Sequence, residues 1–151
     1  MKYRLGGTAL TRWEIPPGWN YQQYLQIYGQ VGWLFGAVSL KANSVADVAW
    51  HLYANRGQGN REEIDDHPLL DLLHKVNPFQ TRYQFMQLAE SYCSLVGESF
   101  IVLDYNGLGV PAQMWLAPPG NMKVILGENY ISHYEYSVGT EILRLELPEV
   151  I

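Results

Sequence analysis

The sequence predicts an α+β fold in which N-terminal helices pack on a mostly antiparallel β-sheet. As far as Val96, apolar residues recur at three- and four-residue steps, which is the periodicity of amphipathic helices. From Ser99 onward the pattern changes to short runs of strand-forming residues separated by glycine-containing turns. Helices followed by strands are typical of an α+β domain with a mostly antiparallel sheet. The length of 151 residues fits one such domain with one sizeable core.

The first 20 residues are predicted to form an extended N-terminal arm, because glycine and proline pairs interrupt any regular element there. The α+β region then spans residues 21–151. Its first helix is predicted over residues 21–28, since Asn20 and Gln23 have the spacing of a capping box and Gly29 supplies a stop. A continuous apolar stripe predicts a second helix over residues 31–46.

A strand is predicted over residues 49–54 and a polar loop over residues 55–63. The next segment, HPLLDLLHKVNP (residues 67–78), predicts a short helix with firm ends. Asp65 and Asp66 complement its positive N-terminus, Pro68 is tolerated in a first turn, and Pro78 ends the element. Its leucines cover more than half of the circumference, so we expect a wedge between the helical layer and the sheet that is buried on most sides. The leucines expected in the core are Leu69, Leu72 and Leu73.

The long helix that follows is predicted over residues 82–96, because Thr81 and Gln84 repeat the capping-box spacing and Gly97 ends the stripe. Residues 99–105 and 111–117 then form a predicted hairpin around Asn106-Gly107, a pair that readily adopts positive φ. Three further strands are predicted over residues 122–126, 131–138 and 141–147.

Composition limits the function. The formal net charge is −5 and the ten basic residues are scattered, which argues against a protein that grips nucleic acid by neutralising phosphates. Aromatic residues make up 13% of the chain, so some apolar surface is expected to face a partner. Cys93 is the single cysteine, which excludes an internal disulfide. The most apolar run, residues 31–40, is too short to span a bilayer, and no signal peptide is visible at the N-terminus, so no membrane partner is expected.

No residue is assigned a catalytic, cofactor-binding or metal-binding role. His67 and His74 are about 10 Å apart along a helix axis, too far for one zinc ion. The acidic run at residues 62–66 is interpreted as a solvated, helix-complementing segment. Cys93 is predicted to be a buried, inert thiol beside the apolar stripe. His51 and His133 lie in predicted strands with no acid at a telling spacing.

The order of these features resembles the N-terminal part of tailed-bacteriophage portal proteins of the HK97 type. The resemblance runs from about Tyr24 to Ile151 and is carried by HPLLDLL followed by Asn-Pro, by the Thr81-capped helix leading into a glycine-bounded strand, by PAQMWLAPPGNMKV, and by a strand that contains Tyr-Glu-Tyr. The chain departs from the family after Gly97, where Glu-Ser-Phe stands in place of an expected Asn-Ala-Tyr.

The resemblance implies a structural subunit without enzymatic activity or cofactors, in the capsid of a phage or prophage. Full-length portals form a homo-oligomeric ring, expected to be a dodecamer, at the unique capsid vertex. The ring is the conduit for DNA packaging and ejection, nucleates virion assembly, and docks terminase, capsid and head-tail connector proteins. Double-stranded DNA passes through the ring without sequence-specific binding. The protein itself is expected at the portal vertex of the virion and, during assembly, in the host cytoplasm. The present chain would hold the wing-like part, truncated before the stem, clip and crown.

Two alternatives stay open at this point. One is a free-standing protein-interaction or regulatory module that shares only the local pattern. The other is an enzyme that uses His51 or His133 in a cleft formed on folding.

Overall fold

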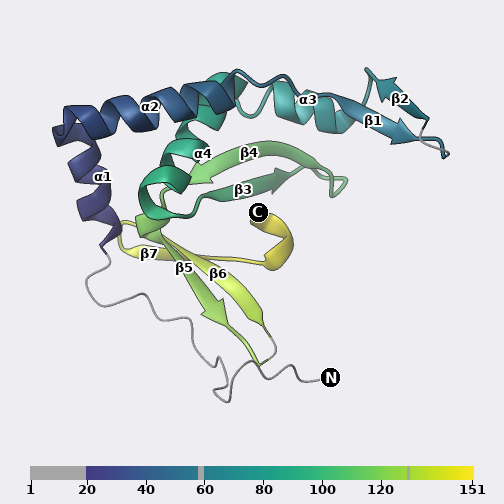
Figure 1. Ribbon diagram of the computed structural model, residues 1–151. Coiled ribbons are helices and arrows are strands. Elements are labelled where there is room, and N and C mark those ends of the chain that lie inside the picture. The colour runs from purple at the N-terminus through teal and green to yellow at the C-terminus, as the bar shows by residue number, and fades with distance from the viewer. Residues whose placement is uncertain (1–19, 58–59, 129) are drawn as a thin grey trace, which may run out of the picture.

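The computed structural model describes residues 20–57, 60–128 and 130–151 (Figure 1). The predicted arm at residues 1–20 lies outside these ranges, apart from Asn20. Four α-helices are described: α1 (Tyr21–Gln30), α2 (Gly32–Ala46), α3 (Pro68–His74) and α4 (Arg82–Val96). The strands are β1 (Leu52–Asn55), β2 (Arg61–Ile64), β3 (Phe100–Tyr105), β4 (Pro111–Ala117), β5 (Met122–Leu126), β6 (Ile131–Val138) and β7 (Glu141–Leu145). Two 3-10 turns complete the order, η1 (Pro119–Asn121) and η2 (Leu147–Glu149).

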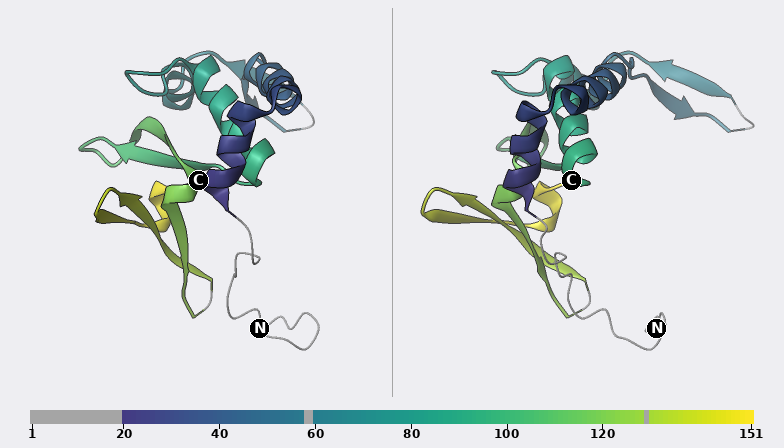
Figure 2. Two further views of the ribbon diagram at one scale, coloured as in Figure 1. Left: turned by 90° about the vertical axis from the view of Figure 1, so that its left-hand side faces the viewer. Right: turned by 60° about the vertical axis from the view of Figure 1, so that its left-hand side comes forward.

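The α+β class is confirmed, and every strand pair in the described sheets is antiparallel. The strands do not form one sheet, however. They divide into the hairpin β1–β2, the hairpin β3–β4 and the three-stranded sheet β5–β6–β7, which Figure 2 shows as a separate layer below β3 and β4. The chain crosses from β4 to β5 through η1. Its N-cap Pro118 and its first residue Pro119 lack the N–H groups that a continuing ladder would need.

Two apolar clusters hold these layers together. The first joins α3, α4 and the hairpin β3–β4 through Leu72, Val76, Phe85 and Met114. The second joins the hairpin β3–β4 to the three-stranded sheet through Phe100, Ala117, Met122 and Val150. The hairpin β3–β4 therefore has one face in each cluster and forms the middle layer of the fold.

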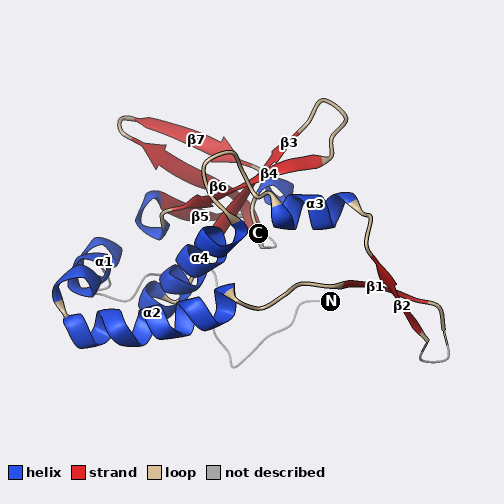
Figure 3. Ribbon diagram, turned by 90° about the horizontal axis from the view of Figure 1, so that it is seen from above, coloured by secondary structure: helices blue, strands red, loops and turns tan. Residues whose placement is uncertain are grey.

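Helix α4 lies at the centre of the helical layer, between α2 and the hairpin β3–β4 (Figure 3). Its predicted ends are confirmed: Thr81 and Gln84 form a reciprocal capping box, and Gly97 closes the helix in the left-handed region at φ 84°. Helix α2 is confirmed over nearly its predicted length, and its buried residues Val38, Ala42 and Ala46 occupy one stripe. Short side chains in this stripe let α2 approach α4 closely.

The predicted stop at Gly29 is wrong. Helix α1 continues through Gly29 to Gln30, and the break falls at Val31, which is extended (φ −107°, ψ 100°) and is at once the C-cap of α1 and the N-cap of α2. Asn20 does cap α1, because its side chain accepts a hydrogen bond from the Gln23 N–H. The two helices therefore meet in a sharp bend, called here the α1–α2 elbow.

The predicted short helix exists but is shorter and less buried than expected. His67, rather than Asp65 or Asp66, caps α3: its Nδ1 accepts a hydrogen bond from the Leu69 N–H. Leu72 is buried as predicted and lies between the helical layer and the sheet, while Leu73 is half-buried at the edge of the same cluster. Leu69 is 43% exposed, and Leu70 takes the buried position instead. Only one side of α3 faces the hairpin β3–β4, so the other sides stay in solvent.

The remaining differences concern strands and turns. Strand β1 begins at Leu52 rather than Ala49, and residues 61–64, predicted as part of a loop, form β2. In the turn between β3 and β4, the glycine with positive φ is Gly109 (φ 73°), while the Asn106 side chain accepts bonds from two later N–H groups of the turn. Strand β7 ends at Leu145, and the last residues pair instead with β3, through Val150 and Val102.

Candidate assembly surface

Helix α2 has apolar residues on two opposite faces. The inner face packs on α4 through its buried stripe, while the outer face presents Trp33 and Leu40, which are 79% and 72% exposed. These two residues are seven apart, so they lie on the same side of the helix. A helix that is apolar all round is normally buried on all sides. The outer face of α2 is thus a candidate contact surface for another molecule.

Polar contacts fix the orientation of this outer face. Lys41 pairs with Glu90 on α4 at 2.7 Å, and the Gln87 amide donates to the Asn43 side chain at 2.6 Å. Both contacts tie α2 to α4 at the border of the buried stripe. Because α4 is anchored in the first apolar cluster through Phe85, the outer face of α2 is held by the core of the fold.

The α1–α2 elbow is braced by its own side chains. The rings of Tyr28 and Phe35 lie 5.1 Å apart, and the Tyr28 hydroxyl is hydrogen-bonded to Ser39 at 3.1 Å. At the other end of α1, burial and a hydrogen bond with Glu98 raise the pKa of Tyr21 to about 12. Helix α1 is therefore held at both ends, and Trp33 projects from a rigid corner.

The β1–β2 hairpin extends away from the body of the molecule (Figures 1 and 3). Its strands pair in register from Leu52 with Ile64 to Asn55 with Arg61. Two side-chain contacts connect its sides: an ion pair of Arg56 with Glu62 at 2.8 Å and a hydrogen bond between His51 and Glu63 at 2.5 Å. Exposed apolar side chains also lie in the hairpin and the segment leading to it: Val48, Trp50 and Tyr53.

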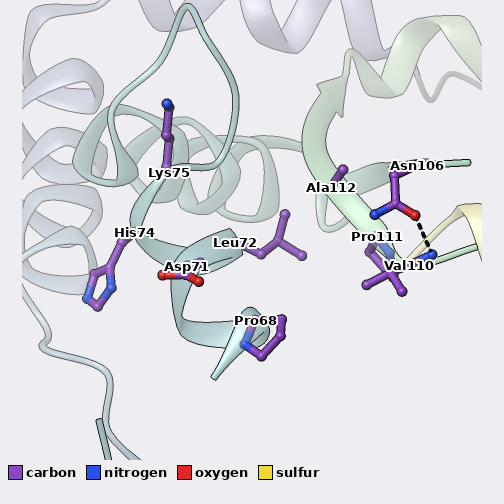
Figure 4. Close-up of a pocket in the computed structure, with 9 residues that line it drawn as sticks. All are labelled: Pro68, Asp71, Leu72, His74, Lys75, Asn106, Val110, Pro111 and Ala112. Carbon is purple, nitrogen blue, oxygen red and sulfur yellow. Dashed lines mark hydrogen bonds between the residues drawn. The ribbon is translucent and has the colours of Figure 1, made fainter. Parts of the chain in front are cut away.

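A shallow hollow of about 430 Å³ lies between α3 and the turn that joins β3 to β4 (Figure 4). Leu72 points toward that turn, whereas His74 and Lys75 point in different directions. A binding pocket for a small molecule needs a few polar groups that converge on one point. The side chains around this hollow do not converge, so it is not assigned as a site.

The residues considered from the sequence for metal or acid–base chemistry are not brought together. His67 caps α3, Asp71 and His74 are exposed on it, and in the described ranges no group of three or more potential metal ligands occurs. In the acidic run, Glu62 forms an ion pair with Arg56, and Glu63 forms a hydrogen bond with His51. The other histidine, His133, is on β6 within 3.9 Å of Glu135.

The prediction that Cys93 is buried is wrong. Cys93 is exposed, because it lies beyond the edge of the stripe with which α4 packs on its neighbours. Partial desolvation and the nearby carboxylate of Glu90 nevertheless raise the pKa of its thiol above the ordinary value. A raised pKa lowers the thiolate fraction and makes the thiol a weak nucleophile.

The exposed aromatic surface could be anticipated only in part. The high aromatic content indicates a partner, but the apolar stripe in the sequence of α2 predicts only one apolar face, and the structure shows a second. The sequence does contain one indication of this second face, since Trp33 and Leu40 are seven residues apart and so lie on the same side of a helix.

None of the helices in the part of the chain that the structure describes has the length and apolar character needed to span a bilayer.

A family model and a related protein match most of this chain. The family model described as "Phage portal protein" matches residues 33–151. An uncharacterised protein of Rickettsia bellii (strain RML369-C) is 26% identical over an alignment of 117 residues, which covers 75% of this chain and 29% of that protein.

Solved structures of gene transfer agent (GTA) particles contain chains of the same fold. A chain in the neck of the empty GTA particle, computed with C6 symmetry, matches with a TM-score of 0.69 and 21% identity over 85% of this chain and 34% of that one. A chain in the neck of the native GTA particle, computed with C12 symmetry, gives a TM-score of 0.68 and 20% identity over 86% of this chain and 33% of that one. The present chain thus spans about a third of the length of the chains it matches.

Proposed function

The chain belongs to the phage portal protein family, and we propose that it is a structural subunit of the portal ring at the unique vertex of a capsid. The observation that carries the proposal is the extent of the family match, which begins at Trp33 and includes all of β1 to β7. The fold supports it, because chains of the same fold occur in particle necks computed with C6 and C12 symmetry. A ring of identical copies, with twelve subunits in the full assembly, accounts for both findings.

In this ring the subunit would line or support a conduit for DNA during packaging and ejection. A conduit must not hold DNA tightly, and tight sequence-independent binding comes from many contacts between basic side chains and phosphates. Several basic side chains are already neutralised within the subunit, since Lys41, Arg56 and Arg144 each pair with a glutamate. Together with the net charge of −5, this supports passage of double-stranded DNA without sequence-specific binding.

The role proposed here is mechanical rather than catalytic. The ring would dock terminase during packaging and head-tail connector proteins afterwards. Catalysis would then belong to terminase and not to the ring. The chain would act at the portal vertex of the virion, after assembly in the host cytoplasm. The exposed apolar face of α2 and the projecting hairpin suit such a part, because apolar surface on a subunit is removed from water when copies assemble.

The test is to express the complete product of the reading frame that encodes this chain and to measure its mass in solution and its shape by electron microscopy. The proposal predicts a ring of about twelve copies with a central channel, in line with the closed symmetry usual for assemblies of one chain. A complete product that remains monomeric at all accessible concentrations would overturn the proposal and favour a free-standing interaction or regulatory module.

A further inference from the structure

The β1–β2 hairpin has little support from the other residues that the structure describes. In the described part of the chain, β1 and β2 make their main contacts with each other. An isolated two-stranded hairpin is only marginally stable in water and normally needs a third strand or a packed surface. The structure nevertheless holds it in an ordered register of four residue pairs. A surface outside the described residues would supply the missing support.

The hairpin has the side chains of a contact element rather than of a solvated loop. One of its faces carries Leu52, Ala54 and Ile64, which are only half-buried in the isolated chain. The other face carries Tyr53, which is 51% exposed and lies beside His51. Aromatic residues surrounded by polar pairs are typical of the central anchors of protein interfaces.

The opposite end of the molecule offers an apolar surface of matching character. Figure 1 shows the α1–α2 elbow at one end of the upper layer and the hairpin at the other, and Figure 3 shows the same separation from above. The elbow exposes Trp33 and part of Phe35, and the outer face of α2 continues this surface to Leu40. The ring contact of Phe35 with Tyr28 keeps the elbow rigid, so the surface is formed before any partner arrives.

Rotational symmetry connects these two ends. In a ring of more than two identical copies, every interface is head-to-tail, so each subunit must use two different surfaces. We infer that the β1–β2 hairpin of one copy docks on the α1–α2 elbow and the outer face of α2 in the next copy. This inference rests on the proposed ring and adds the identity of the two surfaces that close it.

Cross-linking within the complete product tests the pairing. Cysteines are introduced at exposed positions on the two surfaces, Asn55→Cys on the hairpin and Gln30→Cys at the elbow, in a Cys93→Ser background that removes the exposed natural thiol. A short bis-maleimide reagent is then added, and covalent species are separated under denaturing conditions. The double variant should give a ladder that extends beyond dimers, because each copy links to a copy on either side.

The controls separate this inference from the ring itself. Each single-cysteine variant can give dimers at most, and a double variant that pairs Asn55→Cys with Glu128→Cys, at the exposed far turn of the three-stranded sheet, should give no ladder. A ring seen by electron microscopy without a ladder from the hairpin–elbow pair would overturn the inference and leave the proposed function standing. A product that forms no ring would overturn both.

Truncation of the elbow anchor gives an independent measurement. Because Trp33 is exposed in the single subunit, Trp33→Ala should leave the fold intact while raising the protein concentration needed for half-assembly by about tenfold or more, as expected for an aromatic anchor. Leu108→Ala is the matched control, since Leu108 is also exposed and apolar but lies in the β3–β4 turn. Equal assembly of the two variants would contradict the assigned role of the elbow.

Discussion

The burial of Leu72 leads to a quantitative prediction for the wedge formed by α3. Leu72 packs in the cluster that contains Phe85 of α4 and Met114 of β4, so it links the helical layer to the sheet. Replacement by alanine removes three carbon atoms from this contact, which corresponds to roughly 2.4 kcal/mol at about 0.8 kcal/mol per buried methylene. Measured Leu→Ala changes in cores span about 2 to 5 kcal/mol, depending on how well the site can collapse. Leu72 lines an open hollow, so solvent and neighbouring side chains can fill part of the gap. We therefore expect a loss of about 2 to 3 kcal/mol, at the lower end of that range.

The assay is urea denaturation of Leu72→Ala and of Leu69→Ala, which makes the same change on the same helix. Leu69 is 43% exposed, and surface substitutions usually change stability by less than about 0.5 kcal/mol. The difference should lie in the midpoint of unfolding with an unchanged slope, which reports a change in stability alone. Equal losses in the two variants would refute the assigned burial of Leu72 between α4 and β4.

Four further predictions follow from single contacts. Asn77→Ala should lower the free energy of unfolding by about 1 to 3 kcal/mol in the same assay. The buried Asn77 side chain accepts hydrogen bonds from two N–H groups of its own turn and donates one to the Met114 carbonyl. An unchanged free energy of unfolding would contradict this bridge. Gly97→Ala should lower the free energy of unfolding by about 1 kcal/mol. The cost comes from backbone strain at positive φ alone, because no atom crowds the added methyl group. A gain in stability would contradict this reasoning. Ser99→Ala should raise the free energy of unfolding by about 1 kcal/mol, because the Ser99 hydroxyl is buried and has no hydrogen-bond partner among the described residues. A lower free energy of unfolding in this variant would contradict the prediction. The ion pair with Lys41 lowers the pKa of Glu90 below its ordinary value of 4.5. The stabilisation of the fold by this pair is therefore present above pH 4.5 and is lost as the pH falls through the folded-state pKa. The free energy of unfolding, measured against pH, should fall less on acidification in Lys41→Gln than in the unchanged protein, and identical curves would exclude the pair as the cause.

The ends of elements could be predicted where a few adjacent residues decide them. Thr81 and Gln84 satisfy each other's backbone groups within one helical turn, so their spacing alone located the start of α4. Gly97 tolerates the left-handed conformation whatever packs around it. The same reasoning failed at Gly29, because glycine permits a stop without requiring one. The bend came at Val31 instead, where Phe35 packs on Tyr28 across the elbow.

The burial of particular leucines could not be predicted, because it depends on contacts far away in the sequence. At about 3.6 residues per turn the four leucines of α3 share one side of the helix, and the sequence does not show which of them reach the sheet. The choice is made beyond the helix, where Met114 of β4 donates its N–H to the Val76 carbonyl and accepts a bond from Asn77. These bonds hold the C-terminal end of the segment against β4. Leu69 and Leu72 are three residues apart and lie on the same side of α3, so the difference in their burial comes from position along the helix: Leu72 is near the end held on β4, whereas Leu69 is in the first turn. Periodicity predicted the helix, but not how far along it the contact with the sheet extends.

The two features that sequence patterns described least well are also the two that the proposed assembly uses. Residues 61–64 read Arg-Glu-Glu-Ile, which has neither the alternation nor the apolar content of a strand, and β2 exists only through its pairing with β1. Helix α2 was expected to have one apolar stripe and has apolar side chains on two faces. In the described part of the chain taken alone both features are unfavourable, because one leaves a hairpin unsupported and the other leaves Trp33 and Leu40 in water. In a head-to-tail ring each supplies what the other lacks, since the hairpin gains a packing surface and the outer face of α2 is covered. A sequence selected for such a ring need not satisfy single-chain rules at its contact surfaces, so departures from those rules at two opposite ends of one subunit are what cyclic assembly predicts.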